Sequence, residues 1–256
     1  MDEGIEIIEE ALLNSMPPLQ TALLDGWVVR LNKNYTYRSN CACPVYYSES
    51  SGNTEKIHMC EELFEKNKLP PVIKVTPVLQ KGLAGTLVSM GYQDIKKVNV
   101  MRCILKDTMD SSNFELQFSE TPDNEWLAVS AELAGLISPD LISVHCQNLK
   151  SIAAQSIFVK AGYGGKIVGC GYGTVERGYV GIYDLHIDGK YRRRGIGTSI
   201  LKKIMDYGKK NNAQYAYLIV NSSNGNAISL YSNLEFTNLY NYSFWQKPGS
   251  KYKITD

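Results

Sequence analysis

The sequence predicts a fold of the α/β class with α+β layering, and three observations support this prediction. Segments that alternate apolar and polar residues are interleaved with segments that repeat apolar residues every three or four positions. The alternating run 180–187 is followed by the glycine turn Tyr191–Thr198 and then by a helical segment. The two halves of the chain also show the same order of elements, 144 positions apart. We therefore expect sheets flanked by helices.

Taken in order, the apolar spacing predicts helices over residues 1–14, 54–68, 79–90, 124–136, 139–149, 200–207 and 226–234. Strand patterns occupy residues 72–76, 92–105, 114–118, 157–160, 167–173, 180–187 and 215–220. Two hairpins are expected, one formed by strands 26–31 and 35–38 and a final one over 236–246. The polar segment 107–113 has no periodicity, so it predicts a linker between a domain of residues 1–110 and a domain of residues 111–256.

The composition is that of an ordinary globular protein. The chain has 256 residues, 44% of them hydrophobic, and a net charge of +1. This balance argues against nucleic-acid binding, which needs a strongly cationic surface. No apolar run approaches membrane-spanning length and the acidic start does not resemble a signal peptide, so we expect a cytoplasmic protein without a membrane partner. The six cysteines form no C-x-x-C pair, which favours free buried thiols and no metal site.

The turn Tyr191–Thr198, with the sequence YRRRGIGT, has the chemistry of a phosphate cradle. A strand, a glycine turn and a helix bring unpaired amides and the positive end of a helix dipole to one point. Gly195 and Gly197 allow close approach to the backbone, and the three arginines add charges that pair well with phosphate oxygens. The turn therefore predicts a site for the pyrophosphate of a nucleotide-type cofactor.

The repeat at 144 positions indicates that only one half of the chain keeps this site. The shift places Thr54 on Thr198 and continues without a gap, as an ancient duplication predicts. The counterpart of Arg192–Gly197 is Ser48–Asn53, which contains no arginine and includes Glu49. Because a carboxylate repels phosphate, we expect the cofactor to bind the C-terminal half alone.

These motifs resemble those of the GNAT superfamily of N-acyltransferases. Arg192–Gly197, with the spacing R-x-x-G-x-G after a strand, resembles the acetyl-CoA pyrophosphate motif of that family. Asn224–Phe236, with N-x-x-A-x-x-L-Y, resembles its second signature, although Glu235 stands where glycine is more usual. The resemblance covers about residues 114–247. The N-terminal half is similar to the degenerate partner of tandem members. The resemblance implies two GNAT-like lobes, each a mixed, mostly antiparallel sheet flanked by helices.

The resemblance also implies a reaction and a set of site residues. Acetyl-CoA would be the cofactor and CoA the product, with direct attack of an amine on the thioester. Tyr231 would donate a proton to the departing thiolate, which a phenol of ordinary pKa can do. The residues expected to hold acetyl-CoA are Leu185, His186, Ile187, Arg192, Arg193, Arg194, Gly195, Ile196, Gly197, Thr198, Asn224 and Tyr231.

The group that takes the proton of the amine is less well defined. Asp184 and His186 on the strand before the turn are the candidate catalytic residues beside Tyr231, and Glu176 or a chain of waters is an alternative. Three further residues are candidates for an acceptor pocket across the lobes, although cross-strand pairing in a hairpin explains them as well: Trp27, Arg30 and Arg38.

Three functions remain open from the sequence. The first is an N-acetyltransferase whose acceptor is a small primary amine, as a monomer or a homodimer. The second is a protein N-acetyltransferase, and the third is a module that binds or senses acetyl-CoA without catalysis. The turn at 192–197 argues against a purely structural interaction protein.

Overall fold

The strands of this protein form one continuous sheet. The computed structural model describes residues 4–46, 51–77, 82–106 and 114–255, so the predicted linker at 107–113 lies outside the described residues. In the described part of the chain, eleven strands follow the order β1-β2-β3-β4-β11-β5-β10-β9-β8-β7-β6. Only the pairs β3/β4 and β9/β10 are parallel among these strands. The layered, mostly antiparallel α/β fold expected from the sequence is confirmed.

The strands have the bounds β1 Gln20–Leu24, β2 Trp27–Leu31, β3 Ala42–Pro44, β4 Val72–Val75, β5 Gln93–Ile104, β6 Glu115–Ser119, β7 Gln155–Tyr163, β8 Lys166–Glu176, β9 Tyr179–Ile187, β10 Tyr215–Asn221 and β11 Thr237–Gln246. The helices are α1 Gly4–Asn14, α2 Asn53–Lys66, α3 Leu83–Ser89, α4 Asn124–Leu133, α5 Pro139–Lys150, α6 Ile196–Lys210 and α7 Gly225–Ser232, with short 3-10 turns η1 Tyr37–Ser39 and η2 Gly189–Tyr191.

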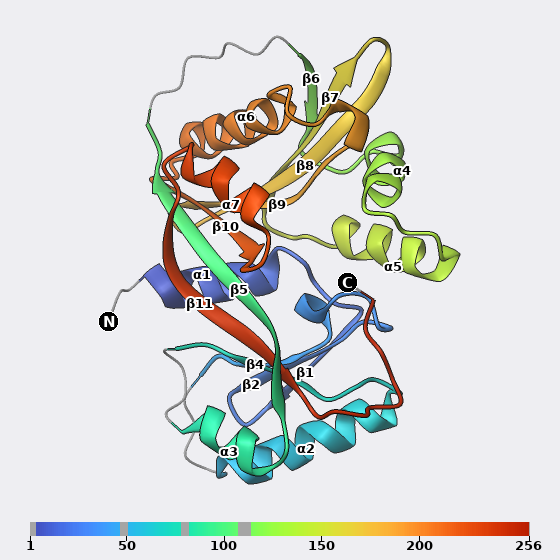
Figure 1. Ribbon diagram of the computed structural model, residues 1–256, viewed down its shortest axis with the longest axis vertical. Coiled ribbons are helices and arrows are strands. Elements are labelled where there is room, and N and C mark those ends of the chain that lie inside the picture. The colour runs from blue at the N-terminus through green and yellow to red at the C-terminus, as the bar shows by residue number, and fades with distance from the viewer. Residues whose placement is uncertain (1–3, 47–50, 78–81, 107–113, 256) are drawn as a thin grey trace.

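Two long strands join the two lobes of the molecule. The N-terminal lobe consists of β1–β4 with α2 and α3, and the C-terminal lobe consists of β6–β10 with α4–α7. Strand β5 lies between β10 and β11, and β11 lies between β4 and β5. Each lobe therefore holds a strand from the other half of the chain. Figure 1 shows β5 and β11 running side by side from the lobe of α6 to the lobe of α2 and α3.

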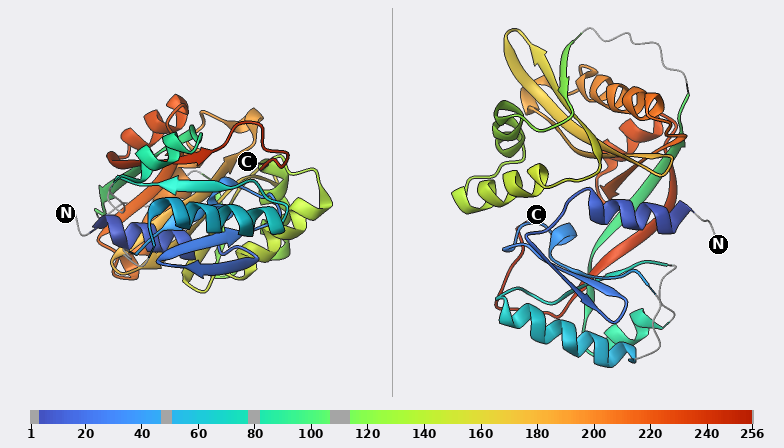
Figure 2. Two further views of the ribbon diagram at one scale, coloured as in Figure 1. Left: turned by 90° about the horizontal axis from the view of Figure 1, so that it is seen from below. Right: turned by 180° about the vertical axis from the view of Figure 1, so that it is seen from behind.

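Helix α1 lies between the two lobes, as the view from behind in Figure 2 shows. Its residues Ile5, Ile8 and Leu12 pack into a core that includes apolar side chains of β5 and β11. Glu9 of the same helix accepts hydrogen bonds at 2.5 Å from both Lys74 of β4 and Tyr240 of β11. A buried charge that keeps such partners holds its helix in one orientation. Helix α1 thus fixes the junction of the lobes.

The predicted repeat agrees with the observed elements. Subtracting 144 from the bounds of α6, β10, α7 and β11 gives 52–66, 71–77, 81–88 and 93–102. These ranges match α2, β4, α3 and β5 to within two residues. The agreement supports a duplication, which remains a proposal.

Both predicted hairpins are wrong, because the strands involved pair with other segments of the chain. Strand β2 pairs with β1 across the turn at Asp25-Gly26, whereas residues 37–39 form a 3-10 turn. Strand β1 lies at the exposed edge of the sheet, so its residues lack a clear apolar alternation. Residues 237–246 form one long strand rather than a hairpin, because β4 and β5 pair with its two edges.

Three glycines of β8 position helix α6. Gly169, Gly171 and Gly173 alternate along β8, and they face Ile196, Ile200 and Ile204 of α6 respectively. A Cβ atom added at Gly173 would lie 2.4 Å from Cγ2 of Ile204. The helix can lie this close to the sheet only because these side chains are absent. Its N-terminus is thereby brought to the end of β9.

None of the helices in the described ranges is long and apolar enough to cross a membrane. All six cysteines are free; five are buried, and Cys146 is partly exposed.

We expect Gly173→Ala to lower the free energy of unfolding by about 1–3 kcal/mol, because the branched side chain of Ile204 has no room to move away. Gly85→Ala in α3 is the matched control: its added Cβ meets nothing within 4 Å. This control gains helix propensity and is expected to raise stability by up to about 1 kcal/mol. Urea denaturation measures both. A Gly173→Ala protein as stable as the parent would contradict the close packing of α6.

Candidate active site

Strands β9 and β10 separate at one end of the sheet. They pair from Tyr179↔Tyr215 to Ile182↔Leu218, and beyond this point both strands continue without pairing to each other. On the other edge of β9, the register with β8 shifts, so that Gly171 faces two residues, Asp184 and Leu185. Asp184 has a φ of 46°, as expected for a bulge that redirects a side chain. The bulge therefore opens a gap between β9 and β10.

The glycine turn lies at the start of α6, as predicted. Gly195 caps the helix with a φ of 90°, a conformation that only glycine adopts without strain. The first hydrogen bond of the helix runs from the Ser199 amide to the Gly195 carbonyl, at 3.0 Å. The amides of Ile196, Gly197 and Thr198 thus have no carbonyl within the helix to bond. They are suited to bind an anion.

The three arginines of the turn are exposed but have different environments. The Nε atom of Arg192 donates to the Ile187 carbonyl at 3.2 Å, which ties the turn to β9 and occupies that carbonyl. Arg193 has a φ of 62°. The Arg194 guanidinium lies 5.8 Å from the ring centre of Tyr163 and 5.5 Å from that of Tyr191. The turn is held locally, and its positive charge faces solvent.

Ile196 and Gly197 of the turn can offer only backbone groups to a ligand. The side chain of Ile196 is buried in the core, so only its amide can reach a ligand. A Cβ atom at Gly197 would make ordinary contacts with Leu230, Ile187 and Leu185. In the N-terminal lobe, Gly52 at the start of α2 has an extended conformation, with φ −71° and ψ 160°, and so differs from Gly195.

A cavity of about 330 Å³ lies where the gap opens between the two lobes. Five of the predicted site residues line it: Asp184, Leu185, His186, Asn224 and Tyr231. The N-terminal lobe, the shared strand β5 and the segment after α4 add Tyr35, Thr36, Arg38, Lys96, Val98, Ala134 and Leu136, and further residues of β9, β10, α7 and β11 make up the rest of the lining. The structure therefore brings the second signature and the bulged strand together at one cavity, next to the helix N-terminus at Gly195.

Tyr231 belongs to α7, and Asn224 is the N-cap residue of that helix. The hydroxyl of Tyr231 has no hydrogen-bond partner among the described residues, and burial raises the pKa of this phenol. It is therefore protonated at neutral pH and can donate. Asn224 uses its side-chain oxygen to cap α7, accepting from the Ala227 amide at 3.1 Å. Only its NH₂ group is left to bind a ligand.

Asp184 forms an ion pair across the lobes with Arg38, at 2.9 Å. Burial alone would raise the pKa of Asp184, but Arg38 and the nearby His186 and His145 outweigh burial and lower it. The side chain is only 9% exposed, and its second oxygen, Oδ2, has no hydrogen-bond partner. This oxygen is an ionised acceptor that lacks a donor, and it is a weak base.

Of the other residues that the sequence suggested as a base or as part of an acceptor pocket, some line the cavity and others lie away from it. His186 lines the cavity, and burial lowers the pKa of its imidazole, which is neutral at pH 7. Glu176 accepts instead from Asn14, away from the cavity lining. Arg38 lines the cavity as expected, whereas Trp27 is buried in the core of the N-terminal lobe and Arg30 donates to the Met16 carbonyl.

The sequence did not identify Tyr35 and Lys96 as site residues, because tertiary contacts alone bring them to the cavity. Tyr35 lies in the loop after β2, where Lys33, Asn34 and Thr36 all have positive φ. Buried asparagines hold this loop: Asn40 donates to the Tyr35 carbonyl at 2.7 Å. The C-terminal Thr255 also accepts from the Thr36 amide, at 2.8 Å. The cluster of asparagines that follows β2 was the one feature of the sequence that could have indicated an ordered loop at this position.

We expect Arg38→Met to lower the free energy of unfolding by about 3 kcal/mol at pH 7, because it leaves the Asp184 carboxylate buried and unpaired. In the parent, the lowered pKa of Asp184 adds stability above pH ~3.9, and this stability is lost as the pH falls through the folded-state pKa. In the variant, burial raises that pKa instead, so the deficit should shrink as the pH falls toward 4.

Urea denaturation between pH 4 and 8 measures this difference. The control is Arg177→Met, which removes a more exposed pair with Glu10 and should cost less than about 1 kcal/mol. A deficit for Arg38→Met that is independent of pH would contradict this account of Asp184.

Among the described residues, no group of three or more His, Cys, Asp or Glu could hold a metal ion.

Comparison with known proteins gives the same picture over nearly the whole chain. Residues 3–245 match the model of a family described as "Probable histone acetyltransferase Rv0428c C-terminal". A relative from Bacillus subtilis (strain 168), the uncharacterized N-acetyltransferase YobR, is 23% identical over 239 residues, covering 92% of this chain and 95% of that protein.

Two solved structures share the fold. The GCN5-related N-acetyltransferase from Kribbella flavida has a TM-score of 0.68 at 15% identity, over 96% of this chain and 95% of its own. A tandem GNAT protein from the clavulanic acid biosynthesis pathway also has a TM-score of 0.68 at 15% identity, over 93% of this chain and 86% of its own. The chain therefore belongs to the family of the probable histone acetyltransferase Rv0428c C-terminal region, and it is an N-acetyltransferase of the GNAT type with two GNAT-like lobes.

Proposed function

We propose that this protein transfers the acetyl group of acetyl-CoA to the primary amine of a small molecule. The observation that carries the proposal is the continuity of three features. The helix N-terminus at Gly195 lies at the end of β9, β9 separates from β10 beside it, and the gap opens into the cavity between the lobes. The helix N-terminus would hold the anionic pyrophosphate of acetyl-CoA. The gap between β9 and β10 would hold its extended pantetheine arm, and the cavity would hold its thioester.

On the donor side, the residues present suit acetyl-CoA. The amides of Ile196, Gly197 and Thr198, with the exposed arginines of the turn, would bind the pyrophosphate. The backbone of Leu185, which lies in the bulge and beyond the last pair of β9 with β10, would bond the pantetheine arm, and the Asn224 NH₂ group would add a donor. Acetyl-CoA bound in this way supplies an activated thioester.

On the acceptor side, the cavity offers a place for a neutral primary amine. The unpartnered Oδ2 atom of Asp184 would accept a hydrogen bond from it. Tyr231 would give its proton to the sulfur as the C–S bond breaks, and its raised pKa keeps the phenol protonated until then.

The size of the cavity favours a small acceptor. A volume of about 330 Å³ is near the lower end of the range for small-molecule sites, and walls from both lobes surround it. A protein amine is the second candidate, because the matching family is described as a probable histone acetyltransferase. A long lysine side chain could enter the same opening. A panel that contains small amines, histone peptides and free peptide N-termini distinguishes the two.

We expect Gly195→Ala to weaken acetyl-CoA binding about 5- to 30-fold, because alanine at a φ of 90° costs about 1–2 kcal/mol. The matched control is Gly189→Ala in the adjacent turn, where an added Cβ meets nothing within 4 Å and φ is not left-handed. Titration calorimetry with acetyl-CoA measures both. The absence of binding by the parent would contradict the proposed cofactor.

We expect Tyr231→Phe to lower kcat about 100-fold and to leave the KM for acetyl-CoA nearly unchanged, because the hydroxyl acts only as the thiolate leaves. Release of CoA thiol with the best amine of the panel measures this. Binding of acetyl-CoA without turnover on any amine would favour the sensing module over the enzyme.

A further inference from the structure

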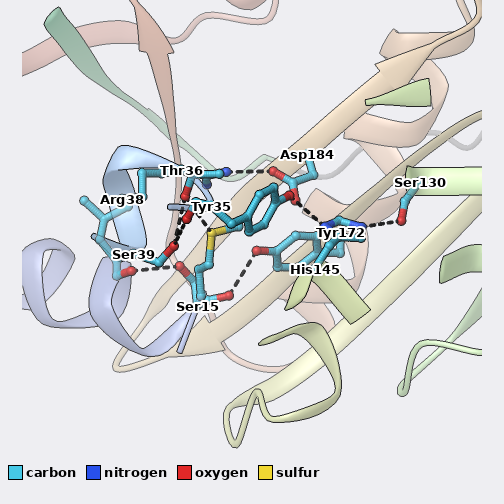
Figure 3. Close-up of polar contacts among 11 residues, drawn as sticks. Ser15, Tyr35, Thr36, Arg38, Ser39, Ser130, His145, Tyr172 and Asp184 are labelled. Carbon is cyan, nitrogen blue, oxygen red and sulfur yellow. Dashed lines mark hydrogen bonds and ion pairs between the residues drawn. The ribbon is translucent and has the colours of Figure 1, made fainter. Parts of the chain in front are cut away.

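Three buried side chains form a series of hydrogen bonds that leads from the cavity wall into the core. The Tyr35 hydroxyl lies 2.8 Å from Nδ1 of His145, and Nε2 of His145 lies 2.8 Å from the Ser130 hydroxyl. His145 belongs to α5 and Ser130 to α4, whereas Tyr35 belongs to the N-terminal lobe. Tyr35 is 6% exposed, and the other two are almost fully buried. Figure 3 shows Tyr35 pointing toward His145, with Ser130 on the far side of the imidazole.

The Ser130 hydroxyl has two acceptors within reach of its single proton, the Leu127 carbonyl at 3.1 Å and Nε2 of His145 at 2.8 Å. We assign that proton to the Leu127 carbonyl. Ser130 then accepts from His145, and the proton of the neutral ring is on Nε2. Nδ1 then has a free lone pair, and Tyr35 donates to it. Burial lowers the pKa of His145, which keeps the ring neutral at pH 7.

The Tyr35 end of this series of hydrogen bonds opens into the cavity. Tyr35 lines the cavity together with Asp184, whose Oδ2 atom lacks a donor. Burial and then the nearby Asp184 carboxylate raise the pKa of the Tyr35 phenol, so the carboxylate acts on this hydroxyl and keeps it protonated. A primary amine between them could donate one hydrogen to Asp184 and direct another at the lone pairs of the Tyr35 oxygen. The cavity thus presents an anchor and a proton acceptor to the same nitrogen.

We propose that Tyr35 is the catalytic residue that removes the proton of the attacking amine, and that His145 acts behind it as the positioning residue that receives the proton of Tyr35. The inference rests on the proposed acetyl transfer and assigns the base that the sequence left open.

The protons balance in this scheme. As the new C–N bond forms, a proton moves from the amine nitrogen to the Tyr35 oxygen, and the original Tyr35 proton moves to Nδ1 of His145. The phenol is restored, and the imidazole becomes a cation. Asp184 is near enough to favour that cation, while Arg38 and His186 oppose it. After the products leave, the proton on His145 returns through Tyr35 to water in the cavity, and the Tyr231 phenolate takes a proton back from water.

The other candidate bases are weaker or lie away from the cavity. Arg38 lowers the pKa of the Asp184 carboxylate, and Glu176 bonds Asn14 outside the cavity lining. His186 lines the cavity and remains the competing candidate.

The test compares Tyr35→Phe and His145→Gln with the parent. Glutamine can accept from Tyr35 and donate to Ser130, so it keeps the hydrogen bonds but cannot take a proton at neutral pH. Each variant should lose about 100-fold or more in kcat, with the KM for acetyl-CoA unchanged. The double variant should lose no more than the worse single variant. Tyr46→Phe and His58→Gln, at exposed positions, should keep the activity of the parent.

The pH profile separates a relay from a structural role. His145 must be neutral to accept a proton, so kcat of the parent should fall as the pH drops through its lowered pKa. That acidic limb should disappear in His145→Gln. If Tyr35→Phe and His145→Gln keep the kcat of the parent and its fall at low pH, the relay is overturned. If the fall at low pH disappears in His186→Gln instead, the base is His186.

Two further results keep the relay distinct from the proposed function. A parent that acetylates no amine would overturn both, whereas an active parent that is indifferent to Tyr35 and His145 would overturn the relay alone. Nitrogen NMR of the histidines in the parent does not require the variants to fold. It should show the His145 proton on Nε2, and a proton on Nδ1 would overturn the relay.

Discussion

The shared strands β5 and β11 are the constraint on which the rest of the structure depends. Because β5 pairs with β10 and β11 pairs with β4, neither half of the chain completes its sheet alone. The two lobes are thereby held against each other by backbone hydrogen bonds, with α1 packed across the junction. The loop that contains Tyr35 and Arg38 is fixed over the bulge of β9 as a consequence. A site made by two lobes needs this rigidity, since catalytic geometry tolerates displacements of only a fraction of an ångström.

The two sides of the site differ in how they are built. The proposed donor side is local: a bulge at Asp184, a turn that requires glycine at position 195 and a helix held close by the glycines of β8 all lie between residues 166 and 210. The proposed acceptor side draws on segments more than 100 residues apart, since Arg38 pairs with Asp184 and Tyr35 bonds His145. A conserved donor reaction with a variable acceptor would follow naturally from such a division.

This difference explains what the sequence could predict. The turn 192–198, Asn224 and Tyr231 were recognisable because short-range spacing determines their geometry, and the fold class followed from the periodicity of the elements. Tyr35, His145 and Ser130 could not be recognised, because no spacing along the chain links them. The predicted hairpin at 236–246 failed for the same reason: a long strand that is paired on both edges by distant segments looks locally like two short ones. Of Trp27, Arg30 and Arg38, only the structure shows that Arg38 alone reaches the cavity.

We expect one cofactor site in this chain, at the gap between β9 and β10. A crystal structure of the protein with acetyl-CoA is the decisive measurement. It should show one molecule per chain, with its pyrophosphate on the amides of 196–198 and its thioester in the cavity beside Tyr231 and Asp184. A molecule bound at the start of α2, or one whose thioester points away from the cavity, would contradict this expectation.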